Sequence, residues 1–155
     1  MVKFYHLLVV MGLIVSACGD AIFEARRDLA TGYWFRNDSL HFEFLVTDTL
    51  PSYAIKCAVR YTPAYPYYNL YLYYQLKDKK GTLLQQGMKE TYLFDPQDGT
   101  PQGKGTGNLY EKEFALLPSF RFGKQGSYIL SLVQYMRPDT LRHLGSVSVS
   151  IQPAK

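Results

Sequence analysis

The chain has 155 residues, enough for one domain that removes roughly two thirds of its unfolded surface from water. Hydrophobic residues make up 47% of it and charged residues 19%, a composition that excludes an intrinsically disordered chain. The formal net charge of +4 comes from basic residues scattered among acidic ones, so no nucleic-acid-binding surface is predicted.

Residues 1–17 have the pattern of a signal peptide. Lys3 precedes an apolar run from Leu7 to Val15, which is shorter than the roughly 20 residues that a membrane-spanning helix needs. The segment Val15-Ser16-Ala17-Cys18 resembles a bacterial lipobox, in which the thiol of the cysteine is alkylated by a diacylglyceryl donor. We therefore expect a lipid on Cys18 that tethers the mature chain to a membrane, with an ordinary secretory signal as the alternative.

Residues 18–30 mix charged and small residues without periodicity, so we expect a lipid-anchored tether there. The folded domain is then expected to comprise residues 31–155. Cys57 is the one cysteine besides Cys18, and the domain is therefore predicted to lack an internal disulfide.

From His41 onward, apolar and polar residues alternate, which is the pattern of half-buried strands. A turn is predicted at residues 78–81, and 138–144 is the one segment that could hold a helical turn, ended by Gly145. Short strands with glycine- and proline-bearing loops predict an all-β fold, a single antiparallel two-layer β-sandwich of jelly-roll or Ig-like type. The expected strands are 41–46, 53–61, 70–77, 83–94 as one or two strands, 110–117, 127–136 and 147–151.

Aromatic residues are the candidate contacts for a ligand or partner. Tyr71 and Tyr73 alternate with Leu70 and Leu72, so a sheet covered on one side would expose both tyrosine rings. Such rings can stack on a sugar or on another protein, although ordinary packing on a strand face is the favoured alternative. The full candidate set is Trp34, Tyr65, Tyr67, Tyr71 and Tyr73.

The sequence predicts no catalytic residue, no metal site and no cofactor. Gly103, Gly105 and Gly107 surround Lys104, but a strand is expected after them, whereas a phosphate-binding loop needs a following helix. A remote glycosidase hypothesis would use Asp98 with Glu111 or Glu113, and these glutamates lie on the expected solvated face of a strand.

Several segments together resemble one known family. They are the lipobox at Cys18, Trp34, the run Tyr65-Pro66-Tyr67-Tyr68-Asn69-Leu70, Gly126-Ser127-Tyr128 and Gln134-Tyr135-Met136-Arg137. In these segments, and over almost the whole mature chain, the sequence resembles the GldH family of gliding-motility lipoproteins. The tyrosine-rich run and the Gln-x-Met-Arg segment are the most specific parts of the resemblance.

The resemblance implies a non-catalytic envelope lipoprotein that supports gliding and the associated secretion of surface adhesins. Its partners would be the membrane, through the lipid, and other envelope machinery proteins. No strong acidic run follows Cys18, so we expect the outer membrane, facing the periplasm. The alternative function is a surface carbohydrate-binding module that uses the aromatic candidates as stacking platforms.

Overall fold

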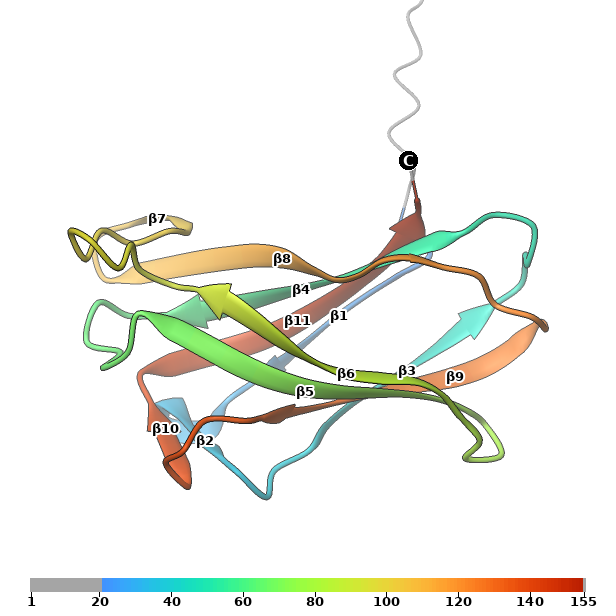
Figure 1. Ribbon diagram of the computed structural model, residues 1–155, viewed down its shortest axis with the longest axis horizontal. Coiled ribbons are helices and arrows are strands. Elements are labelled where there is room, and N and C mark those ends of the chain that lie inside the picture. The colour runs from blue at the N-terminus through green and yellow to red at the C-terminus, as the bar shows by residue number, and fades with distance from the viewer. Residues whose placement is uncertain (1–20, 155) are drawn as a thin grey trace, which may run out of the picture.

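The computed structural model describes residues 21–154, so the expected signal peptide and Cys18 lie outside the described residues. Within that range the chain forms eleven strands and one short 3-10 turn, with no long helix (Figure 1). The elements are β1 (Phe23–Asp28), η1 (Ala30–Gly32), β2 (Tyr33–Phe35), β3 (Leu40–Val46), β4 (Tyr53–Tyr61), β5 (Asn69–Asp78), β6 (Leu83–Tyr92), β7 (Lys104–Thr106), β8 (Leu109–Phe120), β9 (Gly126–Gln134), β10 (Thr140–Arg142) and β11 (Leu144–Pro153).

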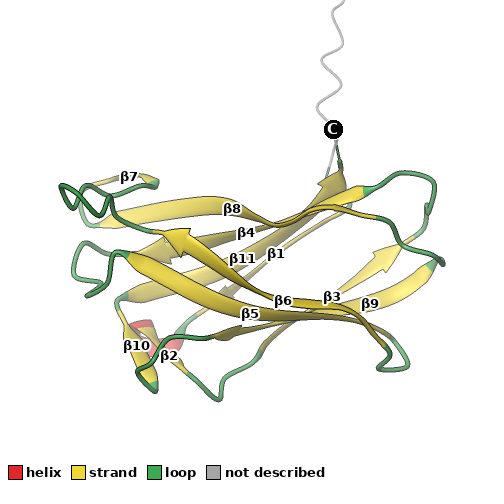
Figure 2. Cartoon of the chain, viewed as in Figure 1, coloured by secondary structure: helices red, strands yellow, loops and turns green. Residues whose placement is uncertain are grey.

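Two antiparallel sheets pack face to face. One sheet has the strand order β1-β11-β4-β8-β7 and the other has the order β3-β9-β5-β6, while β10 and β2 form a separate two-stranded ribbon. Strands make up more than half of the described chain, and loops join them (Figure 2). The predicted all-β antiparallel sandwich is therefore confirmed.

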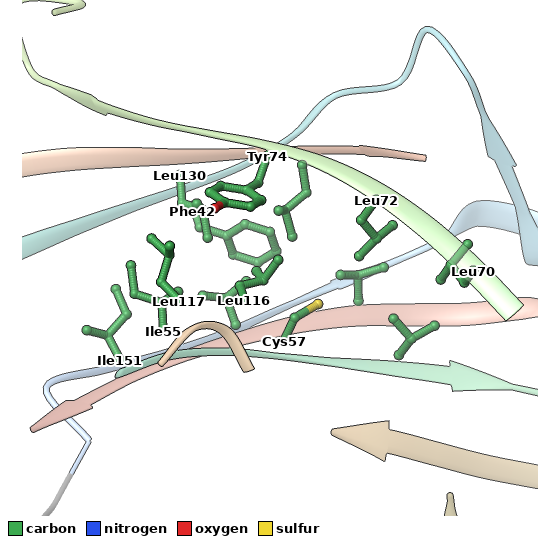
Figure 3. Packing of buried hydrophobic residues seen from close by; sticks show 14 of the residues in the cluster. Phe42, Ile55, Cys57, Leu70, Leu72, Tyr74, Leu116, Leu117, Leu130 and Ile151 are labelled. Atoms are coloured by element: carbon green, nitrogen blue, oxygen red, sulfur yellow. The ribbon is translucent and has the colours of Figure 1, made fainter. Parts of the chain in front are cut away.

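The core lies between the two sheets and follows the period-two patterns of the sequence. Side chains at alternate positions of β4, such as Ile55 and Cys57, are fully buried against those of β5, such as Leu70 and Leu72. Figure 3 shows these aliphatic side chains, with Phe42 and Leu130, directed into the space between the sheets. One face of each long strand thus supplies the core, and the other face is left for solvent or for a partner.

The segment expected to be a tether is partly a strand. Phe23–Asp28 forms β1 and pairs antiparallel with β11, with Phe23 opposite Ile151. The Ile22 amide also donates to the Ile151 carbonyl at 2.8 Å, so the domain includes residue 22 and does not begin at residue 31. The alternation of apolar and polar residues is weak in β1 because β1 is an edge strand. Phe23 and Ala25 are partly buried, and its other four residues are exposed.

The prediction of a helical turn at residues 138–144 is wrong, because this segment contains the strand β10. Leu141 lies opposite Trp34 of β2, and both side chains are buried in the core. His143, with φ of 67°, makes the turn into β11 in place of the expected stop at Gly145. No helix among residues 21–154 has the length and apolar character needed to cross a bilayer.

The sandwich has two distinct ends. Residue 21 enters β1 beside the end of β11, and the C-terminus lies at this entry end (Figure 1). β4 ends at Tyr61, β5 begins at Asn69 and β9 ends at Gln134 at the opposite, far end. Residues close to a lipid on Cys18 in sequence therefore join the domain at one end, and the loops after β4 and β9 lie at the other.

Candidate functional site

Exposed aromatic and methionine side chains gather on the outer face of the β5–β6–β9 sheet near the far end. Tyr73 of β5 lies opposite Met88 of β6, and its ring centroid is 5.8 Å from that of Tyr135. Tyr135 is 60% exposed and Met88 is 57% exposed. Exposed apolar side chains that touch one another form a patch, which single scattered residues do not.

These side chains border a groove of about 690 Å³, which we call the tyrosine groove. The groove is open to solvent, and its walls come from the start of β5, the middle of β6 and the segment after β9. Its lining residues are Tyr67, Tyr68, Asn69, Tyr71, Met88, Tyr135, Met136, Arg137 and Pro138.

The two most specific segments of the family resemblance meet in this groove. The Tyr135 amide donates to the Tyr71 carbonyl at 2.8 Å, and the Tyr71 amide donates to the Met136 sulfur at 3.3 Å. The tyrosine-rich run forms one wall and the Gln-x-Met-Arg segment forms the other, although 65 positions separate Tyr71 from Met136. The fold therefore builds one surface from both.

A buried amide side chain fixes the wall after β9. Gln134 is fully buried, and its Nε2 donates to the Pro138 carbonyl at 3.0 Å while its Oε1 accepts from the Met136 amide at 2.8 Å. The Arg36 guanidinium also donates to the Met136 carbonyl at 2.7 Å and to the carbonyl of Arg137. A backbone held by these bonds presents Tyr135 and Met136 in a fixed position, which lowers the entropic cost of binding.

Polar contacts with Glu90 of β6 involve two of the lining residues, Asn69 and Tyr71. Asn69 Nδ2 donates to Glu90 at 2.7 Å, and a hydrogen bond to the same carboxylate, aided by burial, raises the pKa of the Tyr71 hydroxyl. Tyr71 is therefore neutral at physiological pH. The ring of Tyr68, which lines the groove, stacks on that of Tyr92 with an interplanar angle of 9°.

Two of the five candidate aromatic residues are not surface residues, which corrects their assignment as contacts. Trp34 is fully buried, and its Nε1 donates to the Asp38 carbonyl at 2.9 Å. Tyr65 is also buried, with its hydroxyl bonded to the Asn69 carbonyl and its ring edge-on to Tyr67. Both rings support the structure under the loops of the far end and offer no face to a ligand.

The other three candidates are half-buried and lie on or beside the groove. Tyr67 and Tyr71 line it directly, and Tyr73 borders it through Tyr135. The candidate set omits Tyr68, Met88 and Tyr135, which are more exposed than any of the three. The alternation that puts Tyr71 and Tyr73 on the outer face also puts Met88 there, but this follows only once the pairing of β6 with β5 is known.

The carboxylates considered for glycoside hydrolysis all have structural partners. Glu111 accepts from Arg60 Nε at 2.6 Å, and Glu113 accepts from Lys56 Nζ at 3.0 Å. Hydrogen bonds from the amide and hydroxyl of Thr100 lower the pKa of Asp98, whereas a general acid needs a raised pKa. Among the described residues no group of His, Cys, Asp and Glu side chains could hold a metal ion.

Comparisons with known proteins find a family and a distant structural likeness. Residues 21–151 match the profile of the GldH lipoprotein family, and no curated protein matches the chain. The chain is similar to the VP2 subviral particle of infectious bursal disease virus, with 16% identity and a TM-score of 0.36 over 86% of this chain and 31% of that one. The Gt strain of the same virus gives 15% identity and a TM-score of 0.36 over 84% of this chain and 29% of that one. The chain spans about a third of the length of these viral chains, and a likeness at this level carries no argument about function.

Proposed function

Because the chain belongs to the GldH lipoprotein family, we propose that it is a non-catalytic assembly component of the gliding-motility and associated protein-secretion machinery. In this proposal a lipid on Cys18 holds the domain at the outer membrane, facing the periplasm. The β-sandwich then binds other envelope proteins through the tyrosine groove.

The observation that carries the proposal is the composition and rigidity of the groove. Tyrosine, methionine and arginine are enriched in protein interfaces, where a few such residues dominate the binding energy. The groove brings together Tyr67, Tyr71, Met88, Tyr135 and Arg137, and Gln134 and Arg36 hold the backbone of the wall after β9 in place.

The position of the groove supports docking by a membrane-anchored protein. The chain enters β1 at one end of the sandwich, whereas β5 begins and β9 ends at the other (Figure 1). The residues that line the groove lie at or near the start of β5 and the end of β9. A lipid attached before residue 21 would therefore leave the groove directed away from the membrane surface. A partner could reach it there without displacing lipid.

The first experiment compares a groove variant with a matched surface variant in the native host. We expect Tyr71→Ala combined with Tyr135→Ala to reduce co-purification of envelope partners from detergent extracts by at least about tenfold, because hot-spot rings contribute most of an interface's affinity. Phe35→Ala is the control, since Phe35 is 50% exposed on the β2–β10 ribbon and is not among the residues that line the groove. Equal recovery of partners by both variants would contradict the role of the groove.

The same strains test the wider function. Deletion of the gene, or Cys18→Ala, is expected to abolish gliding or the export of surface proteins. Normal export after deletion would count against an assembly role, whatever the groove binds.

A carbohydrate-binding role is the second candidate, and the parallel rings of Tyr68 and Tyr92 are the observation that favours it. Burial of Trp34 and Tyr65 removes two of the five stacking platforms on which this alternative relied. Binding on a glycan array that is lost in Tyr71→Ala and Tyr73→Ala would favour it over protein docking.

A further inference from the structure

The edges of the two sheets differ in how they are protected from pairing with another chain. Edge strands expose unpaired backbone groups, and natural proteins cover them or place charges, prolines and bulges there. Edge strand β1 carries Glu24, Arg26, Arg27 and Asp28. On edge strand β3, the carbonyl of His41 accepts a hydrogen bond from Arg27.

The edge of β8 is protected by several devices. The short strand β7 covers its first residues, from Leu109 to Glu111. Further along, β8 contains Pro118, and its pairing with β4 shifts register on either side of Ile55. Proline removes a ladder donor and a register shift bends the strand, so both discourage an added strand.

Strand β6 has fewer protections, which are the charges of Lys89 and Glu90 and a register shift at its start, between Leu83 and Gln85. It has ten residues, contains no proline, and pairs regularly with β5 from Gln85 to Tyr92. Within the described part of the chain, β5 is its only neighbour in the sheet. The second edge of β6 is therefore open along most of its length.

The hydrogen-bond pattern identifies which backbone groups are free. The Leu93 amide donates to the Tyr68 carbonyl at 2.8 Å, which continues the β5–β6 register and makes this a hydrogen-bonded pair. Since such pairs alternate along antiparallel strands, the amides of Gly87 and Lys89 point toward β5. The amides and carbonyls of Gln86, Met88 and Glu90 then point away from β5, toward the open edge.

Apolar side chains occur along the same strand. Leu83, Leu84, Met88 and Tyr92 are all exposed, and Met88 also lines the tyrosine groove. An added strand would bring its own outer-face side chains beside Met88 and Tyr92. Backbone pairing would then supply affinity, and the neighbouring groove would supply selectivity for side chains.

Lys89 favours a partner with an acidic residue over a second copy of this chain. Its side chain lies on the inner face of β6, opposite the buried Leu72, and it has no ion-pair partner among the described residues. An inward-pointing lysine on an edge strand discourages indiscriminate pairing. If the β6 strands of two copies paired antiparallel with Met88 opposite Met88, their Lys89 side chains would be diagonal neighbours of like charge. A partner with a carboxylate opposite Lys89 would instead form a cross-strand ion pair.

We propose that the open edge of β6 is the docking site for an extended, acid-bearing segment of a partner protein, which pairs with Gln86–Glu90 as an additional strand. This inference rests on the proposed assembly role and names the chemistry of the partner. It assigns to β6 the backbone recognition that the side chains of the tyrosine groove cannot provide.

The test uses the mature chain and blocked synthetic peptides of alternating threonine and valine, of the ten-residue length of β6. One peptide has a central aspartate, one has a lysine at that position, and one has a central proline. We expect the aspartate peptide to slow hydrogen exchange at the amides of Gln86, Met88 and Glu90, and the proline peptide to leave them unchanged. The aspartate peptide should bind about twofold to fivefold more tightly than the lysine peptide, the size of one exposed cross-strand ion pair.

Two pairs of variants separate backbone pairing from side-chain contacts. Gln86→Pro removes an outward amide and should abolish peptide binding, whereas Gln86→Ala keeps the amide and should bind as the parent chain does. Lys89→Glu should reverse the preference between the aspartate and lysine peptides, and Lys89→Gln should remove it.

Several results would overturn the proposal. They are unchanged exchange at the three amides with every peptide, equal binding by Gln86→Pro and Gln86→Ala, or a dimer that Gln86→Pro dissociates. Tyr71→Ala with Tyr135→Ala tests the groove separately and should leave peptide-induced protection intact. A normal gliding and export phenotype after gene deletion would refute the proposed function without altering the peptide result.

Discussion

At the scale of single residues, Gln134 shows how a buried polar side chain can organise an exposed surface. Its side-chain amide hydrogen-bonds the backbone of the segment that follows the end of β9. Nε2 donates to the Pro138 carbonyl, and Oε1 accepts from the Met136 amide. A buried amide is tolerated only when its hydrogen bonds are made, so this side chain fixes the course of the chain around it. The position of Tyr135 and Met136 in the groove follows from that constraint.

The two cysteines give a direct test of lipid attachment. Cys57 is fully buried, and burial raises the pKa of its thiol, so the native domain should not react with a thiol reagent at this position. If Cys18 is acylated through sulfur, the native lipoprotein should show no reactive thiol and the unfolded one should show a single thiol, that of Cys57.

The measurement is a thiol titration of the chain purified from its native membrane, with and without denaturant. Cys57→Ala is the control and should abolish the thiol that appears on unfolding. One reactive thiol in the native protein, retained in Cys57→Ala, would show that Cys18 is free and would refute the anchor.

Aromatic residues show where sequence reasoning ends at this scale. Alternation with Leu70 and Leu72 correctly places Tyr71 and Tyr73 on the outer face of β5. Trp34 lies in a three-residue strand, which is too short for alternation to indicate which face is buried. Tyr135 follows the last residue of β9, so its position beside Tyr73 depends on the pairing of two distant strands.

At the scale of elements, strands with a regular pattern could be predicted, and short or edge strands could not. Strands β3, β4, β5 and β11 each alternate buried side chains with exposed or half-buried ones over most of their length, as the sequence indicates. The ribbon of β2 and β10 has three residues in each strand, and its stability comes from burying Trp34 against Leu141. That tertiary contact has no local signal.

The glycines before β8 provide a prediction about close backbone approach. A Cβ atom at Gly105 would collide with the Leu109 carbonyl oxygen across the β7–β8 pair. Gly105→Ala should therefore lower the free energy of unfolding by about 1–3 kcal/mol, the usual cost of an added group that has no space.

Gly123→Ala is the matched control, because nothing lies within 4 Å of a Cβ at that position and its φ is not in the left-handed region. Urea denaturation of the two variants beside the parent chain makes the comparison. Equal unfolding midpoints for all three proteins would mean that β7 does not lie against β8 as described.

At the scale of the whole molecule, the sandwich separates attachment from recognition. Chain entry lies beside the end of β11, whereas the tyrosine groove lies where β5 begins and β9 ends. The open edge of β6 runs between these two ends. A partner segment paired along β6 would thus extend from the groove toward the membrane side, and the two proposed contacts would reinforce each other on one sheet.

The buried weak acids of the core predict how the stability of the domain depends on pH. Burial is the main cause that raises the pKa values of Cys57, Tyr61 and Tyr65 above their ordinary values of 9.0 for the cysteine and 10.0 for the tyrosines. The unfolded chain therefore releases these protons at lower pH than the folded chain does. Their contribution to stability is complete below about pH 9 and decreases as pH rises above it, with a slope of up to about 1.4 kcal/mol per pH unit for each group.

Urea unfolding midpoints measured from pH 7 to pH 11 test this dependence. We expect these groups to cause no change in the unfolding midpoint with pH below about pH 8, a first decrease above pH 9 from Cys57 and a steeper one above pH 10 when the tyrosines join it. Cys57→Ala should remove the first decrease and retain the second, and Tyr65→Phe should reduce the second. A decrease above pH 9 that is unchanged in Cys57→Ala would show that the thiol is not buried in the folded domain, which would contradict the register of β4 between β11 and β8.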